Sequence, residues 1–202
     1  SLLNFGPLLW PIGREFGIQI YGFHFWDQLW QCGVCSLWNG MFNGGFPFLA
    51  DPFTGALHPI SAVTGSLAGA VDGAKLTVIA SLWMAGIGQW WLGKTIGLGR
   101  WSRLWVALAA TSGGHIIGRM ELGAVALALS TAASSLALAG AINLAIHPSR
   151  KAALGLAVVL ALALLAGHGY LQIALLFWAP WLALIAWEQW KGPSSPWREF
   201  AL

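Results

Sequence analysis

Charge is what this chain lacks most. Only 8% of its 202 residues are Asp, Glu, Lys or Arg, whereas 57% are hydrophobic and the mean hydropathy is +0.69. A soluble domain carries about 25% charged residues, so this chain has too few to cover a water-facing surface. The net charge of +3 does not indicate nucleic-acid binding, because the basic residues are scattered and form no continuous patch. The composition therefore predicts an integral membrane protein.

Cysteine is also scarce, and the two cysteines lie together in Cys32-Gly33-Val34-Cys35. No second Cys or His pair lies nearby at zinc spacing, so a metal site built on this pair is not expected. A disulfide would form if the loop faced an oxidising compartment, although it would remove little unfolded-state entropy. The alternative is that both cysteines are structurally incidental.

Several motifs that identify soluble enzymes are absent: the nucleophile elbow, the phosphate loop, HExxH and the dinucleotide fingerprint. The first ten residues are apolar but short, and no charged region precedes them, so no cleavable signal peptide is predicted. A chain that begins at Ser1 without Met suggests processing or a piece of a longer protein.

Hydrophobic runs, by contrast, are abundant after residue 73. Residues 1–73 hold no run long enough to cross a bilayer, and their Trp, Gly and Pro content predicts short helices at the membrane interface, for example over 29–37 and 57–71. The later runs predict about five membrane helices, at Leu76–Leu92, Leu104–Gly118, Leu122–Ile146, Ala152–Ala166 and Tyr170–Trp187. The second is only 15 residues long and contains glycines, so a thin, tilted or partly re-entrant helix is expected.

The expected fold class is thus an all-α, polytopic transmembrane bundle with an external N-terminal segment rich in Trp and Gly. It divides into an aromatic-rich external or interfacial segment (1–73), the helical bundle (74–190) and a cytoplasmic tail (191–202).

The basic residues fall in alternate gaps between these runs. If the chain crosses the membrane five times, seven basic residues lie on one side: Lys94, Arg100, Arg103, Arg150, Lys151, Lys191 and Arg198. The positive-inside rule then predicts a cytoplasmic C-terminus and an external N-terminal segment.

This orientation gathers the polar residues that could carry chemistry on the external face. Asp27 and Asp51 could each bind a divalent cation or act as a general base. The alternatives are a solvated loop charge at Asp27 and an Asx-type turn at Asp51-Pro52.

Two predicted turns add further polar residues to this face. Arg119 could bind a phosphate with Glu121 as a supporting carboxylate, or the two could simply cap helices. His168 could ligate a haem or chlorophyll-type metal, although a hydrogen-bonded histidine at a helix end is more common.

Residues 36–59, SLWNGMFNGGFPFLADPFTGALHP, resemble the first external loop of GT-C-type membrane glycosyltransferases, with His58 where Tyr is usual. Leu165-Ala166-Gly167-His168 resembles a second recurring segment of that superfamily. The resemblance implies transfer of a sugar from a polyprenyl-phosphate donor at the external face of a bacterial inner membrane.

The same resemblance also implies roles for individual residues. Asp27, within His24-Phe25-Trp26-Asp27, matches the acidic residue that acts as base or as partner of Mg or Mn, and Asp51 shapes the loop. Family members usually carry a spanning helix before this loop and more spans in all. The chain is therefore a fragment or a truncated relative, and catalysis itself stays open.

The main alternative is a non-catalytic accessory subunit of a respiratory or photosynthetic membrane complex. The Trp-rich surface, small size and scattered histidines of this chain fit that role equally well. A transporter is less favoured, because no charge clearly lies at mid-membrane and no inverted repeat is visible. The expected partners are membrane lipids, a polyprenyl-phosphate sugar or other membrane subunits, and no nucleic acid.

Overall fold

The computed structural model describes residues 13–40, 44–51 and 53–190. These residues form an all-α protein with one two-stranded antiparallel ladder, in which Trp38 pairs with Pro47. The elements in chain order are α1 (Phe16–Gln19), α2 (Tyr21–Cys32), the 3-10 helix η1 (Gly33–Leu37), β1 (Trp38–Asn39), β2 (Phe46–Pro47), the 3-10 helix η2 (Phe48–Ala50), α3 (Pro59–Thr95), α4 (Arg100–Ser112), α5 (Gly114–Glu121), α6 (Val125–Ile146), α7 (Arg150–Leu165) and α8 (Gly169–Trp190).

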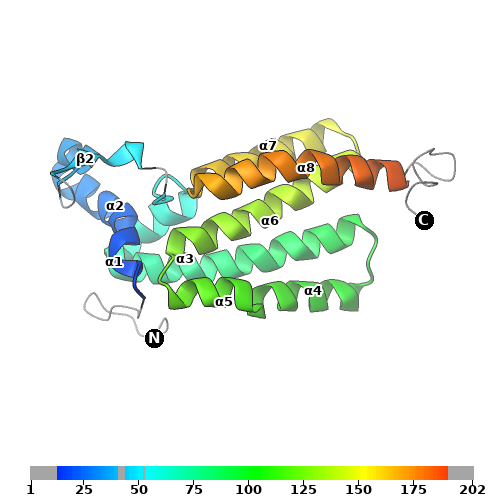
Figure 1. Ribbon diagram of the computed structural model, residues 1–202, viewed down its shortest axis with the longest axis horizontal. Coiled ribbons are helices and arrows are strands. Elements are labelled where there is room, and N and C mark those ends of the chain that lie inside the picture. The colour runs from blue at the N-terminus through cyan, green and yellow to red at the C-terminus, as the bar shows by residue number, and fades with distance from the viewer. Residues whose placement is uncertain (1–12, 41–43, 52, 191–202) are drawn as a thin grey trace.

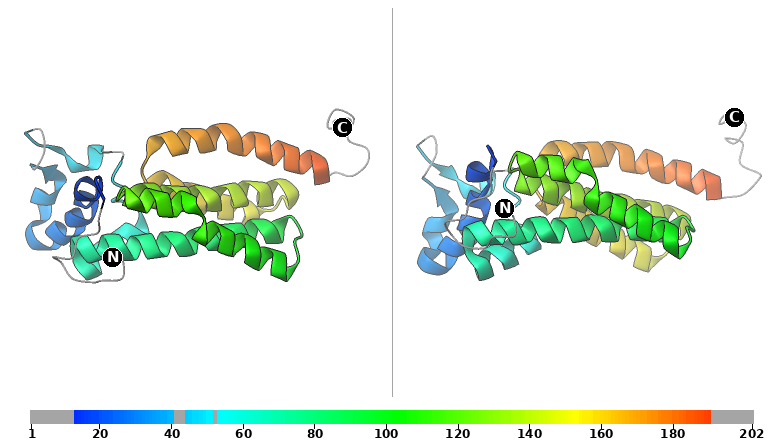
Figure 2. Two further views of the ribbon diagram at one scale, coloured as in Figure 1. Left: turned by 60° about the horizontal axis from the view of Figure 1, so that its bottom comes forward. Right: turned by 90° about the horizontal axis from the view of Figure 1, so that it is seen from below.

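Helices α3 to α8 lie side by side along the long axis of the molecule (Figures 1 and 2). Residues 13–40, 44–51 and 53–58 cover one end of this bundle, which we call the capped end. The α5–α6 and α7–α8 turns reach the capped end, whereas the α3–α4 loop and the α6–α7 turn lie at the opposite, far end. Lys94, Arg100, Arg150 and Lys151 therefore share the far end.

Within the described part of the chain, three helices are long and apolar enough to cross a membrane: α3, α6 and residues Leu171–Gln189 of α8. The fold is thus that of an all-α membrane protein. Helix α7 has 16 residues, which is fewer than the roughly 20 that a bilayer requires. The helix expected over 104–118 is broken at Gly113 into α4 and α5, each of which is also too short to cross alone. Five crossings stay a prediction.

A sharp bend divides α3 at Gly69, whose φ of 73° is a conformation that glycine adopts readily. The two parts fold against each other, because the Thr64 and Thr77 hydroxyls lie 2.7 Å apart. Gly73 allows the approach: a Cβ atom there would lie 2.7 Å from the Thr64 carbonyl oxygen. The interfacial helix expected over 57–71 forms the part before the bend, and the domain boundary expected at 73/74 falls inside α3.

Helix α6 occupies the centre of the bundle. Its small residues allow close packing, and Ala128, Ala132 and Ala133 are completely buried. The Gln89 amide donates a 2.8 Å hydrogen bond to the Ser135 hydroxyl and thereby joins α3 to α6.

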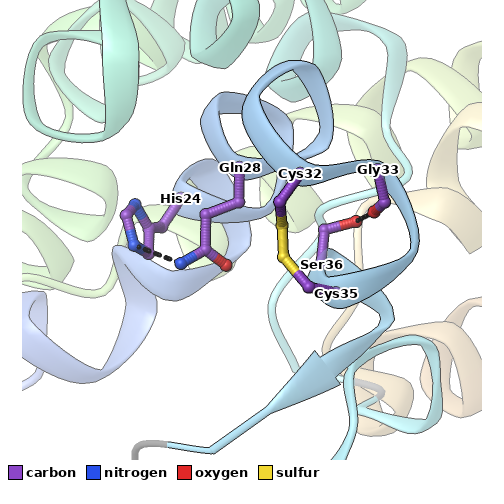
Figure 3. The surroundings of a disulfide bond; sticks show 6 residues. All are labelled: His24, Gln28, Cys32, Gly33, Cys35 and Ser36. Atoms are coloured by element: carbon purple, nitrogen blue, oxygen red, sulfur yellow. Dashed lines mark hydrogen bonds between the residues drawn. A yellow bond between two sulfur atoms is a disulfide. The ribbon is translucent and has the colours of Figure 1, made fainter.

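The two cysteines, whose state the sequence left open, form a Cys32–Cys35 disulfide. Figure 3 shows it where α2 ends and η1 begins, next to the Ser36 hydroxyl that donates to the Gly33 carbonyl. A disulfide is stable in an oxidising compartment, which agrees with the predicted external position of this segment.

Candidate functional site

Two hydrogen bonds fasten the N-terminal segment to the bundle. The Glu15 backbone N–H donates to the Leu122 carbonyl at 2.8 Å. The Gln19 side-chain oxygen accepts from the Ala126 backbone N–H, also at 2.8 Å. One bond ends in the α5–α6 turn and the other in the first turn of α6, so the segment has a fixed position relative to Arg119 and Glu121 of α5.

A second attachment joins the loop after η2 to the α7–α8 turn. Gly55 has φ of 58°, and a Cβ atom there would lie 2.6 Å from the Ala166 carbonyl oxygen. The Phe53 ring meets the His168 ring edge-on, with centroids 5.8 Å apart. The Ser130 hydroxyl of α6 donates to the Gly167 carbonyl at 3.0 Å and holds the turn from the bundle side.

A cavity of about 170 Å³ lies between the loop after η2 and the α7–α8 turn. It is lined by Phe48, Leu49, Asp51, Thr54, Gly55, Ala56, Leu57, Leu164, Leu165 and Gly167. Asp51 is the one ionisable residue among these lining residues. Its carboxylate accepts a 2.9 Å hydrogen bond from the Phe53 backbone N–H, which is the Asx-type turn considered from the sequence.

His168 is buried beside this cavity and has φ of 55°, which is uncommon for a residue other than glycine. Burial lowers the pKa of His168 below its ordinary value, Glu15 and Asp51 act to raise it, and Arg119 acts to lower it. His168 is therefore within electrostatic range of Glu15, Asp51 and Arg119, and we call these four residues the capped-end cluster.

Sequence reasoning placed three members of this cluster on one face and missed Glu15. The available signal was its charge, since Arg14 and Glu15 are the only charged residues before Asp27.

Asp27 lies apart from the cavity lining, on α2. Its carboxylate is 3.8 Å from the His24 ring nitrogen and accepts a hydrogen bond from Gln31. The other His24 ring nitrogen is 2.9 Å from the Gln28 amide, as Figure 3 shows. Asp27 and His24 are each about two-fifths exposed, so this pair is open to solvent or to a lipid headgroup.

Glu121 is exposed at the end of α5 and makes no ion pair with Arg119. In the parts of the chain that the structure describes, no group of three or more His, Cys, Asp or Glu could hold a metal ion.

His58 is a buried polar residue whose role the sequence did not predict. It caps the start of α3, because its Nδ1 accepts a hydrogen bond from the Ile60 backbone N–H. Burial lowers its pKa from 6.5 to about 4, so the ring is neutral and carries its proton on Nε2.

No protein-family model, curated protein or solved structure matches this chain.

Proposed function

We propose that this protein is a GT-C-like integral membrane protein that transfers a sugar from a polyprenyl-phosphate donor at its capped end. One observation carries the proposal. The two segments whose sequences resemble the superfamily, residues 36–59 and 165–168, lie more than 100 positions apart in the chain and yet contact each other around one cavity. The contacts of Gly55 with Ala166 and of Phe53 with His168 make this junction.

In the proposed reaction Asp27 is the general base. Its carboxylate takes the proton of the acceptor hydroxyl, and the freed oxygen forms a bond to the anomeric carbon of the sugar. The bond from that carbon to the donor phosphate oxygen breaks, and polyprenyl phosphate leaves with the electron pair. His24 orients the carboxylate, which is a role that its 3.8 Å separation from Asp27 permits.

The remaining polar residues bind the donor and shape the site. Arg119 neutralises the donor phosphate, with Glu121 as a supporting carboxylate, because guanidinium groups pair strongly with phosphate oxygens. Asp51 and His168 fix the loop and the turn that enclose the cavity. Mg²⁺ commonly binds one or two carboxylates together with substrate phosphates, so Asp27 would supply a single protein ligand to such an ion, or to Mn²⁺.

The proposal places the capped end outside a bacterial inner membrane, with five crossings and the far end in the cytoplasm. The basic residues of the far end support this orientation through the positive-inside rule. The Cys32–Cys35 disulfide supports it independently, because cytoplasmic disulfides are rare.

The test uses the full chain in proteoliposomes with undecaprenyl-phosphate-linked radioactive hexoses, and it measures release of the sugar from the lipid. Asp27→Asn is expected to reduce release at least about a hundredfold, the usual contribution of a general base. Glu188→Gln, which removes an acid from the end of α8, is the matched control and is expected to keep full activity. Unchanged release by Asp27→Asn at equal protein would refute the base assignment.

A second function, as an accessory subunit of a larger membrane complex, is favoured by one specific observation. None of the apolar window of α8 is buried, and Trp178 and Trp181 are more than half exposed. Native mass spectrometry of the complex extracted in mild detergent tests this alternative. A fixed stoichiometry with other subunits or a bound pigment would support it, and a lipid-bound monomer would oppose it.

A further inference from the structure

A long apolar groove runs along the outside of the bundle between α3 and α4, away from the capped-end cavity. Its volume is about 470 Å³, and its lining residues are Trp83, Gly86, Ile87, Trp90, Leu104, Ala107, Leu108 and Thr111. The one hydroxyl among them, on Thr111, donates to the Leu108 carbonyl within its own helix. The groove therefore offers a mostly apolar surface to a ligand.

Gly86 forms the floor of this groove. A Cβ atom on Gly86 would lie 2.9 Å from the Thr111 methyl carbon, so the absence of a side chain allows the helices to approach. Trp83 is 70% exposed and forms a raised wall beside this floor. The groove is thus a built feature of the α3–α4 contact.

Two basic residues extend the walls of the groove towards the far end. Lys94 follows Trp90 by four residues on α3, and Arg100 precedes Leu104 by four residues on α4. Residues four apart on a helix lie on the same face, so both side chains continue the faces that line the groove.

Lys94 and Arg100 are both exposed, and among the described residues neither side chain has a hydrogen bond or an ion pair. Arg103 plays a different part. Its Nε donates to the Leu98 carbonyl at 2.6 Å and holds the loop between the two helices. The open end of the groove therefore has two positive charges available for an anion.

The dimensions match one membrane leaflet. Lys94 and Trp83 are 11 residues apart, as are Arg100 and Thr111, which corresponds to roughly 16 Å along each helix. Half of the hydrocarbon core of a bilayer is about 15 Å thick. Trp101, which is 77% exposed, follows Arg100 directly and lies at the level of the basic residues, as expected at a membrane interface.

We propose that this groove binds one anionic diacyl phospholipid from the leaflet at the far end. The phosphate lies between Lys94 and Arg100, and one acyl chain lies along the groove against Trp83 and Trp90. Charge complementarity selects an anionic headgroup, and the length of one leaflet selects an acyl chain. This site is independent of the sugar transfer proposed for the capped end.

The experiment is native mass spectrometry of the delipidated full chain, titrated with dioleoyl phosphatidylglycerol and, separately, with dioleoyl phosphatidylcholine. The expected result is one phosphatidylglycerol bound several times more tightly than phosphatidylcholine. The double variant Lys94→Gln/Arg100→Gln is expected to lose at least about tenfold in phosphatidylglycerol affinity, since each basic residue near a membrane contributes about a factor of five. Because both residues are exposed, this variant is expected to fold.

The matched control is Arg150→Gln/Lys151→Gln, which removes two basic residues from the same end but outside the groove, and it is expected to keep the wild-type affinity. Ala107→Phe fills the groove and is expected to weaken both lipids. Equal affinities for the two lipids, or equal losses in the two double variants, would overturn the proposal. So would a dimer that Ala107→Phe dissociates, because the groove would then bind a second copy of the chain.

Discussion

The Gln19 side chain caps a helix that begins more than 100 residues later in the chain. Its oxygen accepts a 2.8 Å hydrogen bond from the backbone N–H of Ala126, the second residue of α6, in a buried environment. The first N–H groups of a helix have no partner within the helix, so a buried helix start needs such an acceptor. The N-terminal segment supplies it and thereby completes the central helix of the bundle.

Gln19→Leu removes this acceptor and leaves a buried N–H unsatisfied. We expect a loss of about 1–3 kcal/mol in stability, the usual cost of an unpaired buried donor. Thermal unfolding in detergent measures it, and limited proteolysis should cut residues 13–58 first. Gln31→Leu removes an exposed hydrogen bond within α2 and should leave the unfolding temperature nearly unchanged. Equal shifts for the two variants would contradict the capping role.

Gly55→Ala tests the junction between the two motif segments. The new Cβ atom would meet the Ala166 carbonyl oxygen at 2.6 Å, in addition to the strain of a positive φ. Gly97→Ala is the matched control, because its φ is also positive but nothing lies within 4 Å. We expect Gly97→Ala to lower the stability by about 1–2 kcal/mol because of backbone strain. Gly55→Ala should lower it by about 1–3 kcal/mol more because of overpacking. Calorimetry in detergent would detect the difference, and equal effects would show that the junction is not tight.

Lys75 is completely buried in α3, and its ammonium lies 2.8 Å from the Asp72 carboxylate. Asp72→Asn weakens this pair while the lysine stays buried, so we expect a loss of up to about 3 kcal/mol. The double variant Asp72→Asn/Lys75→Met removes both charges and should recover most of the stability. Chemical unfolding in mixed micelles gives the comparison. If the double variant is less stable than Asp72→Asn, the charge of Lys75 has another important partner.

Protonation of His58 should destabilise the protein in acid. Its pKa is about 4 in the folded protein and 6.5 when unfolded, so the unfolded chain binds the proton more readily. The neutral His58 ring therefore contributes fully to the free energy of unfolding above pH 6.5. At most about 3 kcal/mol of this stability is lost as the pH falls towards 4.

His58→Asn keeps an acceptor for the helix start but removes the titration. Its unfolding temperature should depend less on pH between 6.5 and 4 than that of the wild type. Parallel pH profiles for the two proteins would contradict the assignment.

The long apolar helices could be predicted from the sequence, because uninterrupted hydrophobic runs decide both their existence and their ends. The run Leu122–Ile146 became α6 with a start only three residues later. The region around α3 was less predictable. The sequence predicted an N-terminal segment that ends at residue 73, whereas α3 continues through this position with Asp72 and Lys75 paired inside the helix.

The relative positions of the candidate site residues could be predicted only for those that lie near turns between bundle helices. Arg119 and His168 share one end because successive helices of a bundle reverse direction. The position of Asp27 relative to the cavity could not be predicted, because contacts with residues more than 100 positions away help to hold the N-terminal segment in place. The close approach of Gly55 to Ala166 is such a contact, and no local sequence pattern predicts it.

The bend at Gly69 changes how α3 can fit a bilayer. A straight helix of 37 residues would be about 55 Å long, far beyond the roughly 30 Å of hydrocarbon that it has to match. The portion after the bend, residues 70–95, is about 39 Å long, which a tilt of up to about 40° accommodates, within the range found for membrane helices. The glycine thus relieves hydrophobic mismatch, and it leaves residues 59–68 to lie near the headgroups instead of protruding into water.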